Sequence, residues 1–106
     1  MKVAITSSGK TGSSKIDNRF GRCAYFAIHD LESDKTEFIK NPNKDVNEGA
    51  GPAAAQLIAS QGVKKIISGE FGGKVKTILE DLQIQMIMVN GPEQTVEELI
   101  RLMTTR

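Results

Sequence analysis

The sequence predicts one α/β domain: a mixed five-stranded sheet with helices on both faces, a three-layer arrangement. Apolar residues recur with strand-like spacing in the first 40 residues and mostly with helical spacing after residue 50. Helical and strand-like segments alternate in this second part, which is typical of parallel strands joined by helices. A chain of 106 residues holds one hydrophobic core without disulfides or a structural metal. We therefore expect residues 1–106 to form a single domain.

Three strands are predicted before the first helix. Residues 2–6 form a short β-branched apolar run, which indicates a strand. Residues 24–31 and 36–40 are two further strand-like runs, separated by Glu-Ser-Asp-Lys. Polar turn-forming residues between two such runs favour a hairpin, so these two strands should pair antiparallel.

The first helix and the segments after it follow from the change of period. Pro52 suits a first helical turn, Leu57 and Ile58 share one face, and Gly62 is placed to end the helix. A strand is then expected over residues 64–68, a helix over 73–82 and a strand over 84–89.

A capping box predicts the start of the last helix. Thr95 is followed three residues later by Glu98, the spacing at which the two side chains satisfy free N–H groups of the first turn. The full order is β-β-β-α-β-α-β-α, the order of ribonuclease H-like folds. Nuclease chemistry with two metals requires carboxylates on the central strands, and residues 2–6 contain none.

The composition restricts the classes of function. The net charge of +1 argues against general affinity for nucleic acids or membrane surfaces. One cysteine and one histidine exclude an intramolecular disulfide and a zinc site made only of this chain's thiolates and imidazoles. The N-terminal apolar run is too short for a signal peptide, and no stretch has the length of a membrane span. We expect a cytoplasmic protein with neither nucleic-acid nor membrane partners.

The segment between the first two strands, residues 7–23, is the main candidate for a ligand site. Such long, polar connections are uncommon in compact domains unless they bind something. It carries four positive charges against one, Asp17. The candidate binding residues here are Ser7, Ser8, Lys10, Arg19, Phe20, Gly21 and Arg22.

Two glycine-rich helix starts are further candidates. Gly49 and Gly51 precede the first helix, and Gly69 and Gly72 precede the second, which begins near Lys74. Helix N-termini offer free N–H groups and a positive dipole end to anions, although glycines also serve sharp entry turns. We expect these turns and residues 7–23 to line one crevice. Glu70 would then cap N–H groups, bind a polar edge of the ligand, or simply be solvated.

The single cysteine and the single histidine cannot act together on one metal. Cys23 is either a thiolate, with a pKa lowered by Arg22 and the polar loop, or a small buried residue at the start of a strand. His29 lies six residues further along the same strand, about 20 Å away at ~3.3 Å per residue. We expect His29 at the surface or at the hairpin end. The sequence shows neither a second imidazole nor a set of hydroxyl, imidazole and carboxylate, so no residues for nucleophilic catalysis are recognisable.

The string from Asn18 to Phe26, with Phe20-Gly21-Arg22 at its centre, resembles the signature of the dinitrogenase iron–molybdenum cofactor biosynthesis family. This family contains small NifX-like proteins and the carboxyl-terminal domain of NifB. Further matches cover nearly the whole chain: Asn41, Gly49-Ala50-Gly51, the turn with Gly69 and Gly72, and the ending Thr95-Val96-Glu97-Glu98. The resemblance implies a ribonuclease H-like fold and a cofactor-binding role for these residues.

The resemblance also implies the ligand. It is an iron–sulfur-based cluster or a precursor of the iron–molybdenum cofactor, carried rather than transformed, with a cofactor donor or acceptor protein as partner. Many members carry histidine at the position of Arg19, and arginine cannot ligate iron. The resemblance therefore implies recognition of an anion, or metal ligation through Cys23 alone.

Two other functions remain open from the residues. The same basic segment would suit an enzyme or sensor for a phosphorylated ligand or nucleotide, with a catalytic role for Glu70. It would also suit an interaction subunit in which Phe20 anchors a partner protein and Cys23 completes a metal site between chains.

Overall fold

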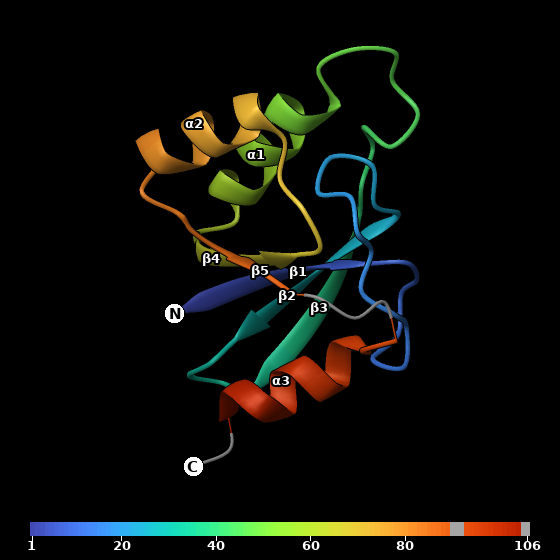
Figure 1. The fold of residues 1–106 in the computed structure, drawn as a ribbon. Coiled ribbons are helices and arrows are strands. Elements are labelled where there is room, and N and C mark those ends of the chain that lie inside the picture. Colours follow the sequence, from blue (N-terminus) through green and yellow to red (C-terminus); the bar gives the residue numbers. More distant parts are fainter. Residues whose placement is uncertain (90–92, 105–106) are drawn as a thin grey trace.

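A computed structural model describes residues 1–89 and 93–104, and its elements follow the predicted order (Figure 1). The strands are β1 (Lys2–Ser7), β2 (Tyr25–Asp30), β3 (Lys35–Lys40), β4 (Val63–Ser68) and β5 (Gln85–Met88). The helices are α1 (Ala50–Ser60), α2 (Gly73–Asp81) and α3 (Val96–Thr104). The predicted five-stranded sheet and three helices are confirmed, with boundaries shifted by at most one residue.

The sheet is mixed, with the order β3-β2-β1-β4-β5. β1 pairs antiparallel with β2 and parallel with β4, and the predicted hairpin of β2 and β3 is confirmed by their antiparallel register. β4 and β5 pair in parallel. The carboxyl ends of β1, β3 and β4 therefore meet at one edge of the sheet, where the connections to β2, α1 and α2 begin.

Helices cover both faces of the sheet (Figure 1). α1 and α2 lie on one face over a cluster that includes Phe26, Ile66 and Leu79. α3 covers the opposite face over a cluster that includes Ile5 and Leu99. Within the described ranges, no helix has the length and apolar character that crossing a membrane requires.

Two local signals fix helix ends as predicted. Gly62, after α1, adopts a φ of +76°, a conformation that favours glycine. At α3 the backbone N–H of Thr95 donates to Glu98 Oε1 at 3.0 Å, and the N–H of Glu98 donates to Thr95 Oγ1 at 3.3 Å. The capping box is therefore formed. The N–H and the hydroxyl of Thr95 both donate to the Glu98 carboxylate, and these two hydrogen bonds lower the pKa of Glu98.

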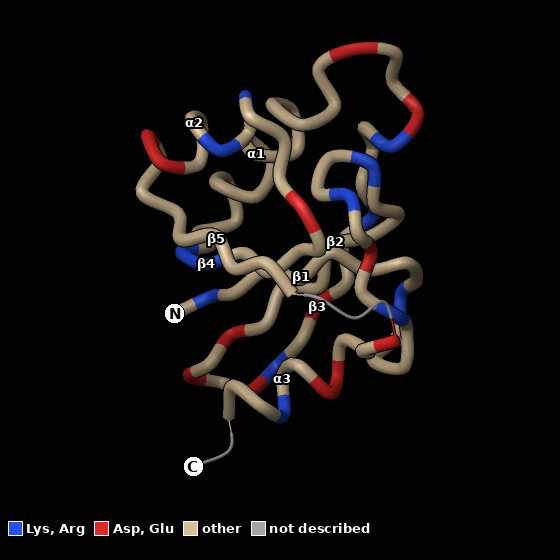
Figure 2. Tube along the Cα trace, in the orientation of Figure 1, with Lys and Arg blue, Asp and Glu red and all other residues tan. Residues whose placement is uncertain are grey.

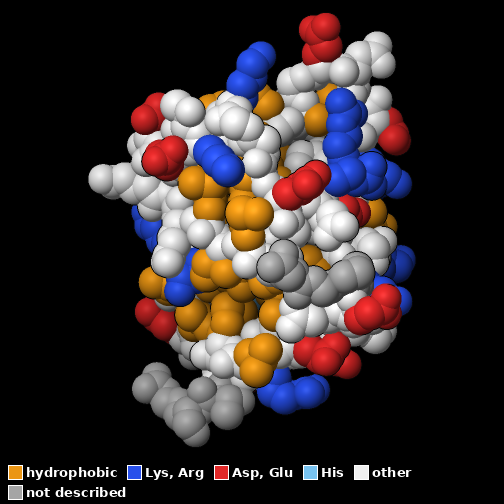
Figure 3. All heavy atoms as spheres, viewed as in Figure 1, with side chains coloured by type: hydrophobic (Ala, Val, Ile, Leu, Met, Phe, Trp, Pro, Cys, Tyr) orange, Lys and Arg blue, Asp and Glu red, His pale blue; other side chains and the backbone are white. Residues whose placement is uncertain are grey.

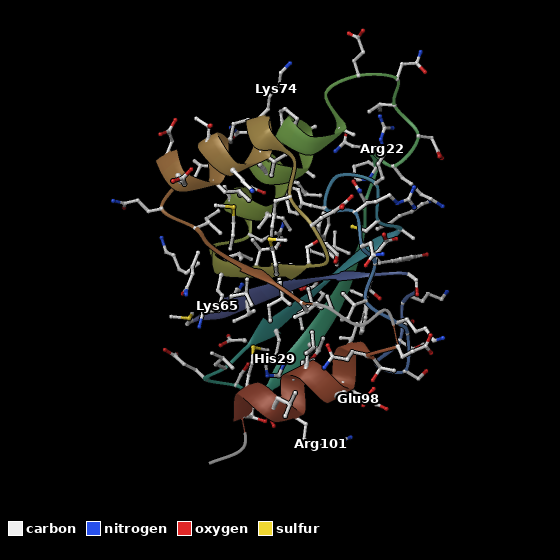
Figure 4. All side chains as sticks on the ribbon, in the orientation of Figure 1. Arg22, His29, Lys65, Lys74, Glu98 and Arg101 are labelled. Carbon is white, nitrogen blue, oxygen red and sulfur yellow. The ribbon has the colours of Figure 1, made fainter. Side chains whose placement is uncertain are left out.

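His29 lies at the hairpin end of β2, one of the two expected places, but it is buried rather than at the surface. Its side chain points toward α3 and is 1% exposed (Figure 4). Nδ1 lies 2.8 Å from the Thr36 hydroxyl on β3, and Nε2 lies 3.3 Å from Asp34 Oδ1 in the hairpin turn. Strand alternation places residue 29 on the same face as buried Ala27, and the Thr36 hydroxyl gives the ring one hydrogen-bond partner there, at Nδ1.

Replacing Thr95 by alanine should lower the free energy of unfolding by about 1 kcal/mol, the usual cost of losing an N-cap. The physical cause is the loss of a side-chain acceptor for the N–H of Glu98. Urea unfolding monitored by circular dichroism measures the change. Thr77→Ala, at an exposed position inside α2, is the matched control. Equal stability losses in the two variants would contradict the role of the capping box.

Candidate functional site

A cavity of about 550 Å³ lies beyond the carboxyl end of β4, between the loop after β1 and the N-termini of α1 and α2. It is lined by three chain segments that are far apart in the sequence. These are residues 19–22, residues 47–52 and a third segment comprising Glu70 and residues 72–75. Of the predicted binding residues, seven line this cavity: Arg19, Phe20, Gly21, Arg22, Gly49, Gly51 and Gly72. The predicted crevice therefore exists, with a smaller set of lining residues.

Glycines bring the three segments into contact. A Cβ atom on Gly21 would lie 2.8 Å from both Cα and N of Gly51, at the first turn of α1. A Cβ on Gly51 would in turn lie 2.4 Å from Cγ2 of Val75 in α2. Real Cβ atoms do not approach other atoms this closely, so only glycine allows this stack of loop, α1 and α2. These two glycines set the width of the cavity.

The N-termini of α1 and α2 are left uncapped by side chains. Gly49 and Gly72 are the N-cap residues, and neither helix has an acidic residue in its first turn. α3 differs, because Glu97 and Glu98 lie in its first turn. Helix N-termini carry a partial positive charge and unpaired N–H donors. In this protein the two helices that face the cavity keep this charge available, while the third neutralises its own.

Charged side chains of both signs surround the cavity. Arg19 and Lys74 are exposed basic residues in its lining, and Glu48 and Glu70 are exposed acidic ones. Arg19 Nε lies 3.5 Å from Asp17 Oδ1, and its own side chain remains 58% exposed. Lys74 extends away from the N-terminal turn of α2 (Figure 4). The lining therefore carries two exposed basic and two exposed acidic side chains, and the helix N-termini add positive charge to it.

Arg22 serves the walls of the cavity rather than presenting a free charge. Its guanidinium donates to the carbonyl oxygens of Lys44 at 3.1 Å, of Asn47 at 3.5 Å and of Val46. Figure 4 shows Arg22 directed toward the loop that precedes α1. A planar guanidinium with several donors suits this task. Arg22 thus positions the loop that carries Glu48 and Gly49.

Asn41, one of the predicted binding residues, does not line this cavity and bonds the backbone of its loop. It is 2% exposed, and its Nδ2 donates to the carbonyl oxygens of Gly21 at 3.0 Å and Cys23 at 2.9 Å. Its Oδ1 accepts from the N–H of Asn43 at 3.0 Å. Asn41 therefore fixes the backbone of the cavity loop from behind.

Cys23 was expected to be either a thiolate with a lowered pKa or a small buried residue, and the structure shows a buried residue. Its side chain is 0% exposed, and the thiol donates to the carbonyl oxygen of Phe20 at 3.4 Å. Burial, with a further contribution from Asp17, raises the pKa of the thiol to about 12. The expected lowering by Arg22 was wrong, because that guanidinium is directed at the loop carbonyls instead. No group of three or more histidine, cysteine or acidic side chains that would hold a metal exists among the residues the structure describes.

The first half of the long loop lies away from the cavity, against α3. The N–H of Val96 donates to the carbonyl oxygen of Ser14, and that of Glu97 to Gly12, both at 2.9 Å. Lys15 Nζ bonds Glu93 Oε2 at 2.8 Å. The predicted binding residues Ser7, Ser8 and Lys10 belong to this region or to β1 and do not line the cavity. The charge of the loop is therefore divided between two sites (Figure 2).

Gly69 and Phe20 also have packing roles. A Cβ on Gly69 would lie 2.6 Å from Cα of Asn18, so this glycine admits the loop against the end of β4. Phe20 is 2% exposed and stacks with Phe26 and Phe71 at centroid distances of 5.6 and 5.7 Å. A ring packed this way is not an exposed anchor for a partner protein, and that expectation was wrong.

The predicted binding residues did not include Lys74 and Glu48, and the role of Glu70 was left open; all three line the cavity. Lys74 follows the glycine turn that starts α2, so its position in the sequence could have included it. Glu48 lines the cavity because Arg22 bonds to the loop before α1 and holds it there. No sequence pattern predicts these contacts.

The family profile described as "Dinitrogenase iron-molybdenum cofactor" matches residues 1–106. This chain belongs to that family. The family's description links the chain to the cofactor of dinitrogenase. An uncharacterized protein of Methanocaldococcus jannaschii, MJ0580, is 30% identical over 105 residues, which cover 96% of this chain and 84% of the relative.

Solved structures agree with this membership. The apo form of the orange protein from Desulfovibrio gigas has a TM-score of 0.86 and 28% identity, covering 96% of this chain and 86% of that one. An NMR structure of a candidate NifB protein from Thermotoga, assigned to the DUF35 family, has a TM-score of 0.82 and 34% identity, covering 97% and 86%. The resemblance to the iron–molybdenum cofactor family is confirmed.

Replacing Gly21 by alanine should lower the free energy of unfolding by about 2 kcal/mol, the usual cost of overpacking. The added methyl group meets backbone atoms of Gly51, which cannot move without displacing α1. Thermal and urea unfolding measure the loss. Gly73→Ala is the control, since a Cβ there meets no atom within 4 Å. An unchanged stability of the Gly21 variant would show that the stack does not fix the cavity.

The Cys23 thiol should be inert toward an aromatic disulfide reagent at pH 8 in the folded protein and react fully after denaturation. Because its folded pKa is raised, the thiol contributes stability below the ordinary value of 9.0, and this contribution is lost as pH rises toward 12. Cys23→Ala should remove this alkaline component from the stability profile. Rapid native labelling would contradict the buried assignment.

Proposed function

We propose that this protein is a non-catalytic carrier that binds an anionic iron–sulfur-based cluster, or a precursor of the iron–molybdenum cofactor, in the cavity between α1 and α2. The observation that carries the proposal is the pair of uncapped helix N-termini facing one cavity, beside Arg19 and Lys74. Metal–sulfur clusters are anions whose sulfides accept N–H hydrogen bonds. Membership in the family supports this choice of ligand.

The proposed binding needs no protein ligand to the metal. Free N–H groups at Ala50 and Gly51, and at the first residues of α2, would donate to the sulfides. Arg19 and Lys74 would balance the negative charge. Cys23 takes no part, since ligation would require its removal from the core. The cluster would therefore arrive with its coordination complete.

The proposal extends to the location, the partner and the fold classification of the protein. We infer a cytoplasmic location, a donor or acceptor protein for the cluster, and a ribonuclease H-like classification of the fold. The strand order β3-β2-β1-β4-β5, with three strands before α1, supports that classification.

Arg19→Ala and Lys74→Ala should each weaken binding of a preassembled iron–sulfur cluster by about tenfold, since each removes a charged partner worth about 1.4 kcal/mol. Anaerobic titration followed by visible absorption measures the affinity. Lys10→Ala is the matched control, because this exposed lysine lies in the same loop but outside the cavity. Cys23→Ala should retain cluster absorption.

Two outcomes would contradict the proposal. The first is an absence of cluster absorption in the wild type after anaerobic reconstitution and after addition of preassembled cluster. The second is a loss of affinity in Lys10→Ala that equals the loss in Lys74→Ala, since that would place the ligand elsewhere.

A second candidate is a sensor or enzyme for a phosphorylated ligand or nucleotide. Uncapped helix N-termini also bind phosphate, and the Glu70 carboxylate in the lining would accept a hydrogen bond from a ribose or base. Thermal shift against a panel of nucleotides and sugar phosphates separates the two candidates. A ligand at ~100 times its dissociation constant stabilises a protein by about 2.7 kcal/mol, so a flat panel removes this candidate.

A further inference from the structure

The two edges of the sheet differ in charge. β3 is one edge strand, and three of its exposed side chains are charged: Lys35, Glu37 and Lys40. β5 is the other edge strand and carries no charge, with the sequence Gln-Met-Ile-Met. In the described part of the chain β5 pairs only with β4. Charged residues protect an edge from pairing with another strand, and β5 lacks this protection.

β5 contributes apolar side chains to both core clusters. Met86 packs against the cluster under α1 and α2, with Ile78 and Leu82 of α2, and Ile87 packs against the cluster under α3. Met88 is 57% exposed and Leu102 is 66% exposed. Figure 3 shows a continuous hydrophobic area that faces the viewer over β5, between the regions of α2 and α3. A strand added at this edge would therefore complete both cores.

We propose that the β5 edge pairs antiparallel with β5 of a second copy of this chain, so that two sheets join into one. A two-fold axis perpendicular to the sheet keeps each face on its own side. Centred on Ile87, it places Ile87 opposite Ile87 of the partner subunit and Met86 opposite Met88 of the partner subunit. Every directly opposed pair in this centre is apolar, and no like charges meet.

The charges of α2 favour the same occupant. α2 contacts β5 and lies along this edge. Its exposed lysines, Lys74 and Lys76, lie near its N-terminus, and its exposed acidic residues, Glu80 and Asp81, lie at its C-terminus (Figure 2). The two-fold axis sets the two α2 helices antiparallel, so the lysines of one copy lie toward the acidic end of the other. The helix surface is thus complementary to a second copy of itself.

Sedimentation equilibrium from micromolar to millimolar protein tests the dimer. The wild type should associate reversibly, and Met88→Lys should raise the dissociation constant at least about tenfold by placing a charge in the apolar centre. Gln56→Lys, an exposed position on α1, is the control and should change nothing. Circular dichroism confirms that each variant is folded.

A charge exchange on α2 tests the orientation independently. Lys76→Glu and Asp81→Lys should each weaken the dimer about fivefold, since each places like charges across the axis. The double variant should restore wild-type association. A merely destabilised helix would not be rescued in this way, because residues 76 and 81 are five apart and do not pair along the helix. A wild type that stays monomeric over the whole range overturns the proposal. So does a dimer that Met88→Lys leaves unchanged, because its interface would then lie elsewhere.

Discussion

The close approach of Gly21 to Gly51, and of Gly51 to Val75, is the constraint on which the functional half of the molecule depends. It holds the loop at backbone distance from the start of α1, and the start of α1 against the Val75 side chain of α2. Because neither Gly21 nor Gly51 has a side chain, the three segments lie close together and the two helix N-termini open on the same cavity. A methyl group at either glycine would separate the segments and change the electrostatic field that they create together.

The remaining contacts around the cavity reinforce this arrangement from outside. Asn41 holds the carbonyl oxygens behind the loop, and Arg22 holds the carbonyl oxygens of the segment before α1. The side-chain donors of both residues bond to backbone carbonyl oxygens. The charge that remains for a ligand comes from Arg19, Lys74 and the helix ends. A cavity of this kind has fixed walls and an exposed set of charged side chains at its opening.

Most of the fold could be predicted from the sequence, because its signals are local. The β-branched runs, the proline in the first turn of α1 and the capping box at Thr95 each act within a few residues. The burial of His29 was not predicted, because Thr36 and Asp34 come close to its ring only when the hairpin has formed. Sequence position alone could not show this pairing.

The candidate site was predicted in part for the same reason. The glycine turns and the Phe20-Gly21-Arg22 element are local, and they do meet at one cavity. The division of the long loop between α3 and the cavity is a tertiary effect. The positive charge of residues 7–23 therefore overstated the charge available at the cavity, because only part of this loop lies there. The burial of Cys23 depends on tertiary packing, which residue spacing does not reveal.

The inaccessibility of the Cys23 sulfur has a consequence for exchange kinetics. A ligand held in the cavity by N–H groups and two basic side chains has no covalent bond to the protein, so its departure requires no ligand substitution at a metal. Residence is then set by competition with other anions and by ionic strength. Raising the salt concentration would therefore weaken the retention of such a ligand.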